Sequence, residues 1–164
     1  MFVNRAAIAA IVGGLWALVA MPVAAQTEDR AITFGREIFK EKAACQFCHK
    51  WDGGGDQGYG GLAPSLRATK LDKDQITEVV RCGRPGTGMP YHDSFAYTDK
   101  RCYGTDRAEL GAAMPIPGNF LARREMEAIV EFVVTMLQGK GPADYAECVL
   151  FWGSTSQQCD SLKK

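Results

Sequence analysis

The sequence predicts an all-α domain, and three observations support this prediction. Apolar residues recur at helical spacing in the segments 29–44, 72–82 and 123–138. Glycine and proline gather between these segments, as expected of turns. No stretch is convincing as a strand, and we find no internal repeat. A chain of 164 residues is also the size of a single domain.

The first predicted helix, residues 29–44, carries a glycine in its interior. Gly35 costs about 1 kcal/mol there relative to alanine. Phe39 follows one turn later and supplies bulk on the same side. A glycine kept at this position indicates that another helix approaches closely.

The other two predicted helices have clear start and stop signals. Asp72 is a good N-cap, and Gln75 stands three residues later, as in a capping box. Gly83 then ends the second helix. The last helix, residues 123–138, carries a broad apolar stripe and stops at Gly139.

The first 25 residues have the three regions of a cleavable secretory signal. Arg5 is their only charge, an apolar run covers residues 6–20, and small residues end the segment at Ala25. The run is shorter than the roughly twenty residues that span a bilayer, so no membrane anchor is expected after cleavage. We therefore predict export to the periplasm of a domain at 26–164, with a core at about 30–138 and a tail at 139–164.

The charge balance argues against nucleic-acid binding. The chain has 19 Lys and Arg against 19 Asp and Glu, and removal of the signal takes away only Arg5. The exported chain would therefore be weakly acidic. It has no basic stripe that could follow a phosphate backbone.

Four cysteines, Cys82, Cys102, Cys148 and Cys159, lie outside the pair discussed next. An even number in an exported chain indicates disulfides, and four cysteines allow three pairings. We favour the local pairing of Cys82 with Cys102 and of Cys148 with Cys159. Each such loop contributes roughly 3 kcal/mol in the chain-entropy model. The spacing leaves open the alternative pairings, in which disulfides join the tail to the middle of the chain.

The most specific signal in the chain is Cys45-Gln46-Phe47-Cys48-His49. Two thiols three positions apart, followed at once by an imidazole, are typical of covalent attachment of a single haem c. Each cysteine adds to one vinyl group, and the histidine ligates the iron. The alternatives are a thioredoxin-like redox pair, which expects a βαβ context, and half of a zinc site, which needs further ligands.

Two later residues are candidates for supporting this histidine and the porphyrin. Proline keeps a backbone carbonyl, and a ligating histidine usually donates its second ring hydrogen to such an acceptor. Pro64 is therefore the candidate for orienting His49. Leu66 is expected against the porphyrin face.

Two methionines compete for the second axial position of the iron. Met126 and Met136 are assigned to the core, which leaves Met89 and Met114, both followed by proline. We favour Met89, because it closes a glycine-rich loop directly after the second helix. His92 is a third option, although a lone histidine in this setting is expected to be a surface group.

A set of residues spread over 30–138 forms a recognisable pattern. They are Gly35 and Phe39, the Cys45–His49 motif, Pro64-Ser65-Leu66, Gly86-Thr87-Gly88-Met89-Pro90, Glu125, Ile129 and Phe132. With these residues the sequence resembles the class I cytochromes c. The resemblance implies that the first and last helices cross over a covalently bound haem where Gly35 meets Phe132. It also implies an electron carrier without enzymatic activity.

The inserted segment 91–120 and the four extra cysteines narrow the resemblance further. They are similar to the small cytochromes associated with methanol oxidation and other quinoprotein alcohol dehydrogenases. The resemblance implies such a dehydrogenase as donor, and another cytochrome c or a terminal oxidase as acceptor. The alternatives are a haem enzyme or gas sensor with an open sixth position, and a fixed haem subunit of a membrane oxidoreductase complex.

Overall fold

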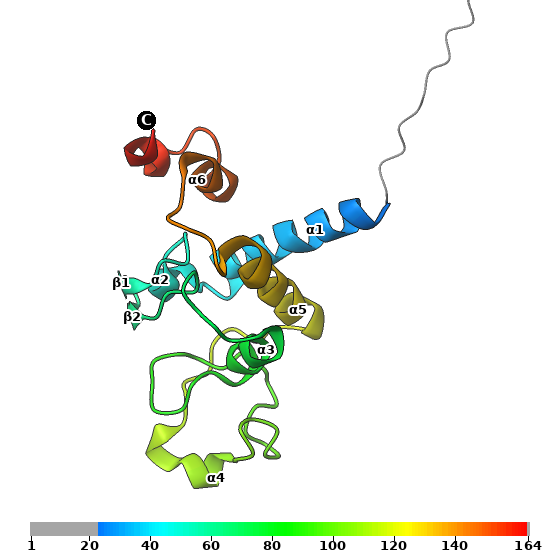
Figure 1. Cartoon of the computed structure of the whole chain (residues 1–164). Coiled ribbons are helices and arrows are strands. Elements are labelled where there is room, and N and C mark those ends of the chain that lie inside the picture. The colour runs from blue at the N-terminus through cyan, green and yellow to red at the C-terminus, as the bar shows by residue number, and fades with distance from the viewer. Residues whose placement is uncertain (1–22, 164) are drawn as a thin grey trace, which may run out of the picture.

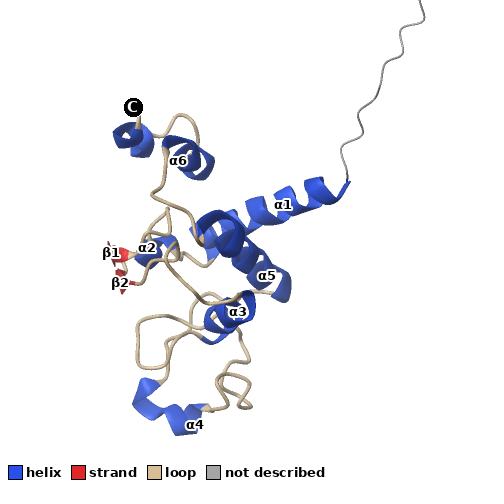
Figure 2. Ribbon diagram, viewed as in Figure 1, coloured by secondary structure: helices blue, strands red, loops and turns tan. Residues whose placement is uncertain are grey.

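The computed structural model describes residues 23–163, with side chains from Arg30 onward. The described chain is mostly helical and contains one small two-stranded sheet (Figure 1, Figure 2). The predicted signal peptide lies outside the described residues, apart from residues 23–25, which begin the first helix.

The first helix, α1, spans Val23–Glu37 and runs on without a break as a π-helical turn, Ile38–Lys42. It begins earlier and ends slightly earlier than the predicted segment 29–44. It packs against α5, Arg123–Phe132. A Cβ atom added at Gly35 would lie 1.9 Å from the carbonyl oxygen of Ala128, so the close approach predicted from this glycine is confirmed.

The last predicted helix is present as α5 and a π-helical continuation, Val133–Leu137. The N-terminus of α5 begins after Ala122, whose side chain cannot cap it. The carboxylate of Glu125 instead accepts a hydrogen bond of 2.8 Å from the amide of Ala122. Half of a capping box therefore replaces the missing cap residue.

The second predicted helix, α3, spans Lys73–Cys82. The capping box predicted at its start is complete. The Gln75 amide donates to the Asp72 carboxylate at 2.8 Å, and the Asp72 amide donates to Gln75 Oε1 at 2.9 Å. Gly83 follows with a positive φ of 63°, as expected for the residue that ends a helix.

The prediction that the chain has no strand is wrong. Strands β1, Asp56–Gly58, and β2, Gly61–Ala63, pair antiparallel with Gly58 opposite Gly61. The two residues Tyr59 and Gly60 form the turn between them. Each strand has only three residues, so neither is long enough to show the alternation by which strands are recognised.

The main core lies where α1, α3 and α5 meet. Its buried members come from α3, α5, the π-helical turns that follow α1 and α5, the residue Leu121 and the tail, and they form one contiguous apolar cluster. They are Ile38, Phe39, Ile76, Val80, Leu121, Met126, Ile129, Val130, Phe132, Val133, Leu137 and Phe151.

The insert, residues 91–120, forms its own small core at one end of the molecule (Figure 1). It contains the short helix α4, Arg107–Leu110, and a 3₁₀ turn, Gly111–Ala113. Its buried cluster consists of Cys82, Tyr91, Ala96, Tyr97 and Cys102. Cys82 and Cys102 form a disulfide there, which is one of the two local pairs that we favoured.

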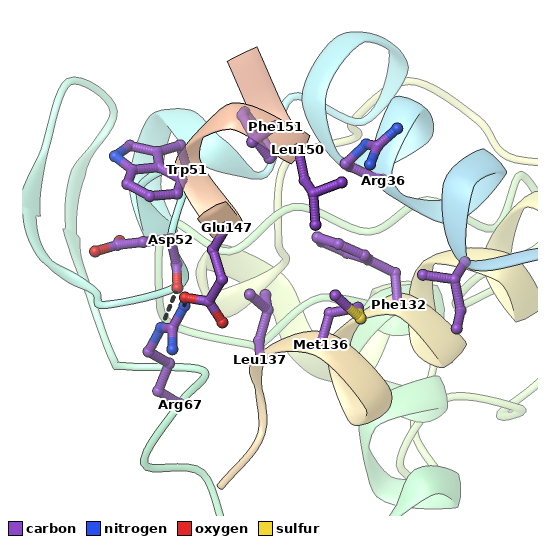
Figure 3. Close-up of a pocket in the computed structure, with 11 residues that line it drawn as sticks. Arg36, Trp51, Asp52, Arg67, Phe132, Met136, Leu137, Glu147, Leu150 and Phe151 are labelled. Atoms are coloured by element: carbon purple, nitrogen blue, oxygen red, sulfur yellow. Dashed lines mark hydrogen bonds and ion pairs between the residues drawn. The ribbon is translucent and has the colours of Figure 1, made fainter. Parts of the chain in front are cut away.

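The tail lies at the opposite end of the molecule and contains α6, Tyr145–Trp152, and a 3₁₀ segment, Gln157–Leu162. Cys148 and Cys159 form the second disulfide, so the local pairing is confirmed. The Arg67 guanidinium joins the tail to the core by donating to Glu147 at 2.7 Å, as Figure 3 shows. It also donates to the carbonyls of Asp52 and Gly141, both at 2.5 Å.

The expectation that His92 is a surface group is also wrong, because only 2% of its surface is exposed. Its Nδ1–H donates to the carbonyl of Asn119 at 2.8 Å, and its amide donates to the carbonyl of Arg81. A Cβ atom at Gly118 would lie 2.6 Å from the imidazole. The insert therefore closes over His92. Burial lowers the pKa of the imidazole, although its bond to Asn119 opposes this shift.

We predict that Gly35→Ala destabilises the protein by about 2 kcal/mol, the usual cost of overpacking. Helix propensity alone would favour alanine by about 1 kcal/mol, so the sign of the change reports the contact with Ala128. Urea denaturation measures the difference. Thr33→Ala, at an exposed position of the same helix, is the control and should change stability by less than about 0.5 kcal/mol. A Gly35→Ala protein as stable as wild type would contradict the prediction.

We also predict that His92 makes stability depend on pH. Its pKa is lower in the folded than in the unfolded chain, so protons bind preferentially to the unfolded chain. This contribution is fully present above about pH 6.5 and is lost as the pH falls towards the folded pKa.

The slope contributed by one such group is at most about 1.4 kcal/mol per pH unit. Free energies of unfolding measured between pH 7.5 and 5 should therefore fall less steeply for His92→Asn than for wild type. Parallel curves for the two proteins would show that His92 is not the group responsible.

Candidate functional site

The Cys45–His49 motif is built around a single helical turn, α2, Gln46–His49. Cys45 is its N-cap, and the amide of His49 donates to the Cys45 carbonyl at 2.9 Å. Cys45 and Cys48 carry free thiols. Residues three apart lie on the same side of a helical turn, so both thiols are available to one ligand.

His49 is buried and has one ring nitrogen engaged. Only 7% of its surface is exposed, and its Nδ1–H donates to the carbonyl of Pro64 at 2.9 Å. Burial lowers the pKa of His49, and the positive charge of Arg84 lowers it further, while the bond to Pro64 opposes the shift. The neutral ring then has Nε2 as its remaining acceptor, which is the form that binds a metal.

The β1–β2 hairpin packs directly on α2 and places Pro64. The amide of Gly60 donates to the carbonyl of Phe47 at 2.9 Å. A Cβ atom at Gly58 would lie 2.4 Å from that same oxygen, and one at Gly60 would lie 2.4 Å from Cys48 Sγ. Glycine is therefore required at both positions, and the hairpin holds the start of the Pro64 segment beside the motif.

Leu66 follows two residues later and is half-buried against the main core. Its amide donates to the carbonyl of Gly53 at 2.8 Å. The same oxygen accepts from the hydroxyl of Ser65, at 3.4 Å. These bonds hold the segment after Pro64 against Gly53, which lies in the glycine-rich stretch 53–61.

Large apolar side chains project from the surface of the motif and its hairpin. Phe47, Tyr59 and Leu62 have exposed fractions of 52%, 99% and 79%. Single exposed apolar residues are ordinary, but here three belong to one hairpin and the turn on which it packs.

Met89 lies near the end of a loop, residues 83–90, that is held by hydrogen bonds within the loop. Its carbonyl accepts from the amide of Arg84 at 3.2 Å, and its amide donates to the hydroxyl of Thr87 at 3.2 Å. A Cβ atom at Gly83 would lie 2.6 Å from the Met89 carbonyl oxygen. The backbone of Met89 is thus fixed, while its side chain is half-buried and belongs to neither apolar cluster.

Met114, the competing methionine, packs against the cluster around the Cys82–Cys102 disulfide. Its amide donates to the carbonyl of Gly111. The structure therefore gives Met114 a packing role in the insert. Met126 and Met136 lie in or against the main core, as expected.

An open hollow of about 370 Å³ lies between α3 and the loop that carries Met89. Its walls are mainly apolar, with one cation and one carboxylate. They are formed by Leu71, Gln75, Glu78, Val79, Arg84, Pro85 and Tyr103. None of Cys45, Cys48, His49 and Met89 lines this hollow, so it does not mark the site of the motif.

The geometry fits a haem better than the two alternatives considered for the motif. Burial raises the pKa of the Cys45 thiol to about 12, whereas a thioredoxin-like pair needs a lowered one. Within the part of the chain that the structure describes, no cluster of three or more His, Cys, Asp or Glu side chains could hold a metal ion. A structural zinc site needs four such ligands.

Sequence reasoning missed three residues around the Met89 loop. Arg84 supplies the positive charge that acts on His49. Tyr97 and Tyr103 donate their hydroxyl hydrogens to the carbonyls of Cys82 and Gly83. The tyrosines lie in the insert, far along the chain from these carbonyls. Only the disulfide, which brings Cys102 to Cys82, could have indicated that they lie close.

Comparison with known proteins gives a single family. Residues 30–112 match the family model described as cytochrome C oxidase, cbb3-type, subunit III, which is a c-type cytochrome domain. No curated protein and no solved structure matches the chain. The matched range contains the Cys45–His49 motif, Pro64 and Met89 and covers half of the chain, which therefore belongs to this family of c-type cytochromes.

Proposed function

We propose that this chain is a one-electron carrier with a single haem c. Cys45 and Cys48 bind the haem as thioethers, and His49 and Met89 are the axial ligands. The observation that carries the proposal is the geometry of α2. Two free thiols flank a turn that ends in a buried histidine, whose Nδ1–H already donates to Pro64.

The protein's own groups prepare His49 for this role. The Pro64 carbonyl fixes the tautomer and the orientation of the ring. Burial and the charge of Arg84 keep the ring neutral, as a metal ligand must be. When bound, the haem supplies one-electron chemistry by cycling between ferric and ferrous iron. Two protein ligands leave no position for a substrate, which favours a carrier over an enzyme or gas sensor.

Three observations favour Met89 over Met114 as the second ligand. Met89 lies within the range that matches the family model, whereas Met114 lies beyond its end at residue 112. Met114 is occupied by packing in the insert. Met89 sits on a loop whose residue Arg84 acts electrostatically on His49.

The proposal extends to the fold, which we assign to the class I type with its first and last helices crossing. The contact of Gly35 with Ala128 and Phe132 supports this assignment. The rings of Phe39 and Phe132 also lie 5.4 Å apart at the same place.

Redox partners would dock on the apolar rim formed by Phe47, Tyr59 and Leu62. A small apolar rim gives a weak interface and fast release, as a carrier requires. We propose a periplasmic location and a quinoprotein alcohol dehydrogenase, such as a methanol dehydrogenase, as the donor. Another cytochrome c or a terminal oxidase would be the acceptor. The insert and its disulfide support this narrower assignment through the resemblance described above.

The family description favours a second candidate, a haem subunit of a membrane oxidase complex. Among the described residues, no helix is long and apolar enough to cross a membrane. Such a subunit would co-purify with the membrane fraction, whereas a free carrier fractionates with the other water-soluble periplasmic proteins.

The proposal predicts that the haem is covalently attached through Cys45 and Cys48. Acidified organic solvent should leave the pigment on the wild-type polypeptide, because thioether bonds survive it. The same treatment should extract all pigment from a Cys45→Ala/Cys48→Ala protein. Cys148→Ala/Cys159→Ala, which removes a cysteine pair elsewhere, is the control and should keep its pigment. Release of the pigment from wild type would end the proposal.

The proposal also predicts that the sulfur of Met89 is the second ligand of the iron. Met89→Ala should abolish the weak long-wavelength sulfur-to-iron absorption band of the ferric protein and lower its midpoint potential. Met114→Ala should retain the band. A spectrum of Met89→Ala that still shows the band would exclude Met89 as the ligand.

A further inference from the structure

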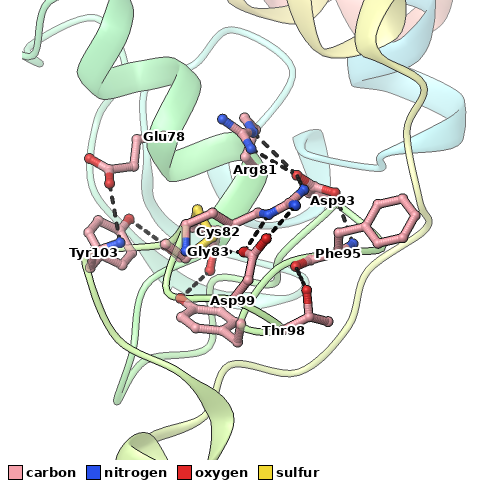
Figure 4. The surroundings of a disulfide bond; sticks show 12 residues. Glu78, Arg81, Cys82, Gly83, Asp93, Phe95, Thr98, Asp99 and Tyr103 are labelled. Carbon is pink, nitrogen blue, oxygen red and sulfur yellow. Dashed lines mark hydrogen bonds and ion pairs between the residues drawn. A yellow bond between two sulfur atoms is a disulfide. The ribbon is translucent and has the colours of Figure 1, made fainter.

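The insert is joined to the Met89 loop by a buried disulfide. Cys82 is the last residue of α3, so the loop of residues 83–90 begins immediately after it. Its partner Cys102 lies in the insert, and the two residues are 1% and 0% exposed. Figure 4 shows the surroundings of this bond. Such burial protects the bond from reductants, as expected of a structural disulfide and not of a redox-regulated one.

Two tyrosines of the insert add hydrogen bonds at the same place. The Tyr97 hydroxyl donates to the Cys82 carbonyl at 2.6 Å. The Tyr103 hydroxyl donates to the Gly83 carbonyl at 2.7 Å (Figure 4). Carbonyls at a helix C-terminus have no partner within the helix. These two tyrosines satisfy the carbonyls at the point where the chain leaves α3 for the loop.

Both hydroxyls are suited to a permanent donor role. Burial raises the pKa of Tyr97 to about 12 and also raises that of Tyr103. Each hydroxyl therefore keeps its hydrogen throughout the physiological range. Tyr103 is itself held, because its amide donates to the carboxylate of Glu78 on α3 at 3.3 Å.

The insert also binds the tip of the loop and the residue that follows it. The amide of Gly86 donates to the carbonyl of Ala113 at 2.8 Å. Beyond the loop, the amide of Tyr91 donates to Ile116, and the Tyr91 carbonyl accepts from Gly118 at 2.8 Å. The loop is thus tied to the insert at its beginning, at its tip and just past its end.

We propose that the insert is a positioning device for Met89, in which the Cys82–Cys102 disulfide, Tyr97 and Tyr103 hold the loop in its ligand-presenting conformation. The proposal rests on Met89 being the axial ligand, as proposed above. A thioether is a neutral ligand that external ligands can displace. Holding its loop in advance reduces the entropy lost on binding and so keeps the sulfur in place.

The test measures how fast cyanide displaces the axial ligand of the ferric holoprotein. Tyr103→Phe and Tyr97→Phe should each speed cyanide binding about fivefold, the factor that corresponds to one ordinary hydrogen bond. Cys82→Ser/Cys102→Ser should speed it more than tenfold. Amide hydrogen exchange in the loop, residues 83–90, should accelerate in the same variants, which gives a second readout that does not depend on the iron.

The tail supplies matched controls. Cys148→Ser/Cys159→Ser removes a disulfide of the same kind, and Tyr145→Phe removes a hydroxyl, both at the far end of the molecule. Both should leave the cyanide rate and the exchange of the loop unchanged. If Cys82→Ser/Cys102→Ser fails to fold, the two tyrosine variants decide the question.

Three results would overturn the proposal. Equal cyanide rates in the insert variants and the controls would do so, as would loop exchange as slow as in wild type. If Met89→Ala loses its sulfur-to-iron band, either of these two results overturns only the positioning role of the insert, and the proposed carrier function stands. Retention of that band in Met89→Ala would instead overturn the ligand assignment and this inference together.

Discussion

The backbone contact between Gly35 of α1 and Ala128 of α5 is the constraint on which the rest of the structure depends. No other residue allows the helices so close, because a Cβ atom at position 35 would lie 1.9 Å from the Ala128 carbonyl oxygen. With the helices in contact, Phe39 and Phe132 meet in the core. The amide of Cys45 then donates to the Phe39 carbonyl at 2.9 Å, so the Cys45–His49 motif begins directly at that core.

The segment after the motif shows how glycine can specify structure. The stretch from residue 50 to 61 has the composition of a flexible loop, yet its second half forms, with residues 62 and 63, a tight hairpin against α2. Gly58 and Gly60 are there because the backbone and a cysteine sulfur leave no room for a side chain. This packing brings the Pro64 carbonyl to His49. The buried imidazole therefore has a partner, without which its burial would cost free energy.

Local signals predicted the helices well, and contacts between distant segments account for what was missed. Asp72 and Gln75 mark the start of α3 because a capping box is entirely local. The three-residue strands carry too little sequence to show a period. The burial of His92 depends on Gly118 and Asn119, which lie at the other end of the insert, more than 20 residues along the chain, so no neighbouring residue indicates it. Tyr97 and Tyr103 escaped notice for the same reason.

The six cysteines divide into three pairs whose chemistry follows from their positions. The insert and the tail lie at opposite ends of the molecule, so a disulfide between them would require large rearrangement. The insert is instead joined to the end of α3, and the tail is closed on itself. Cys45 and Cys48 lie at the single turn α2 and take part in neither disulfide. The fold thus places each oxidised pair in its own part of the molecule and leaves Cys45 and Cys48 as free thiols.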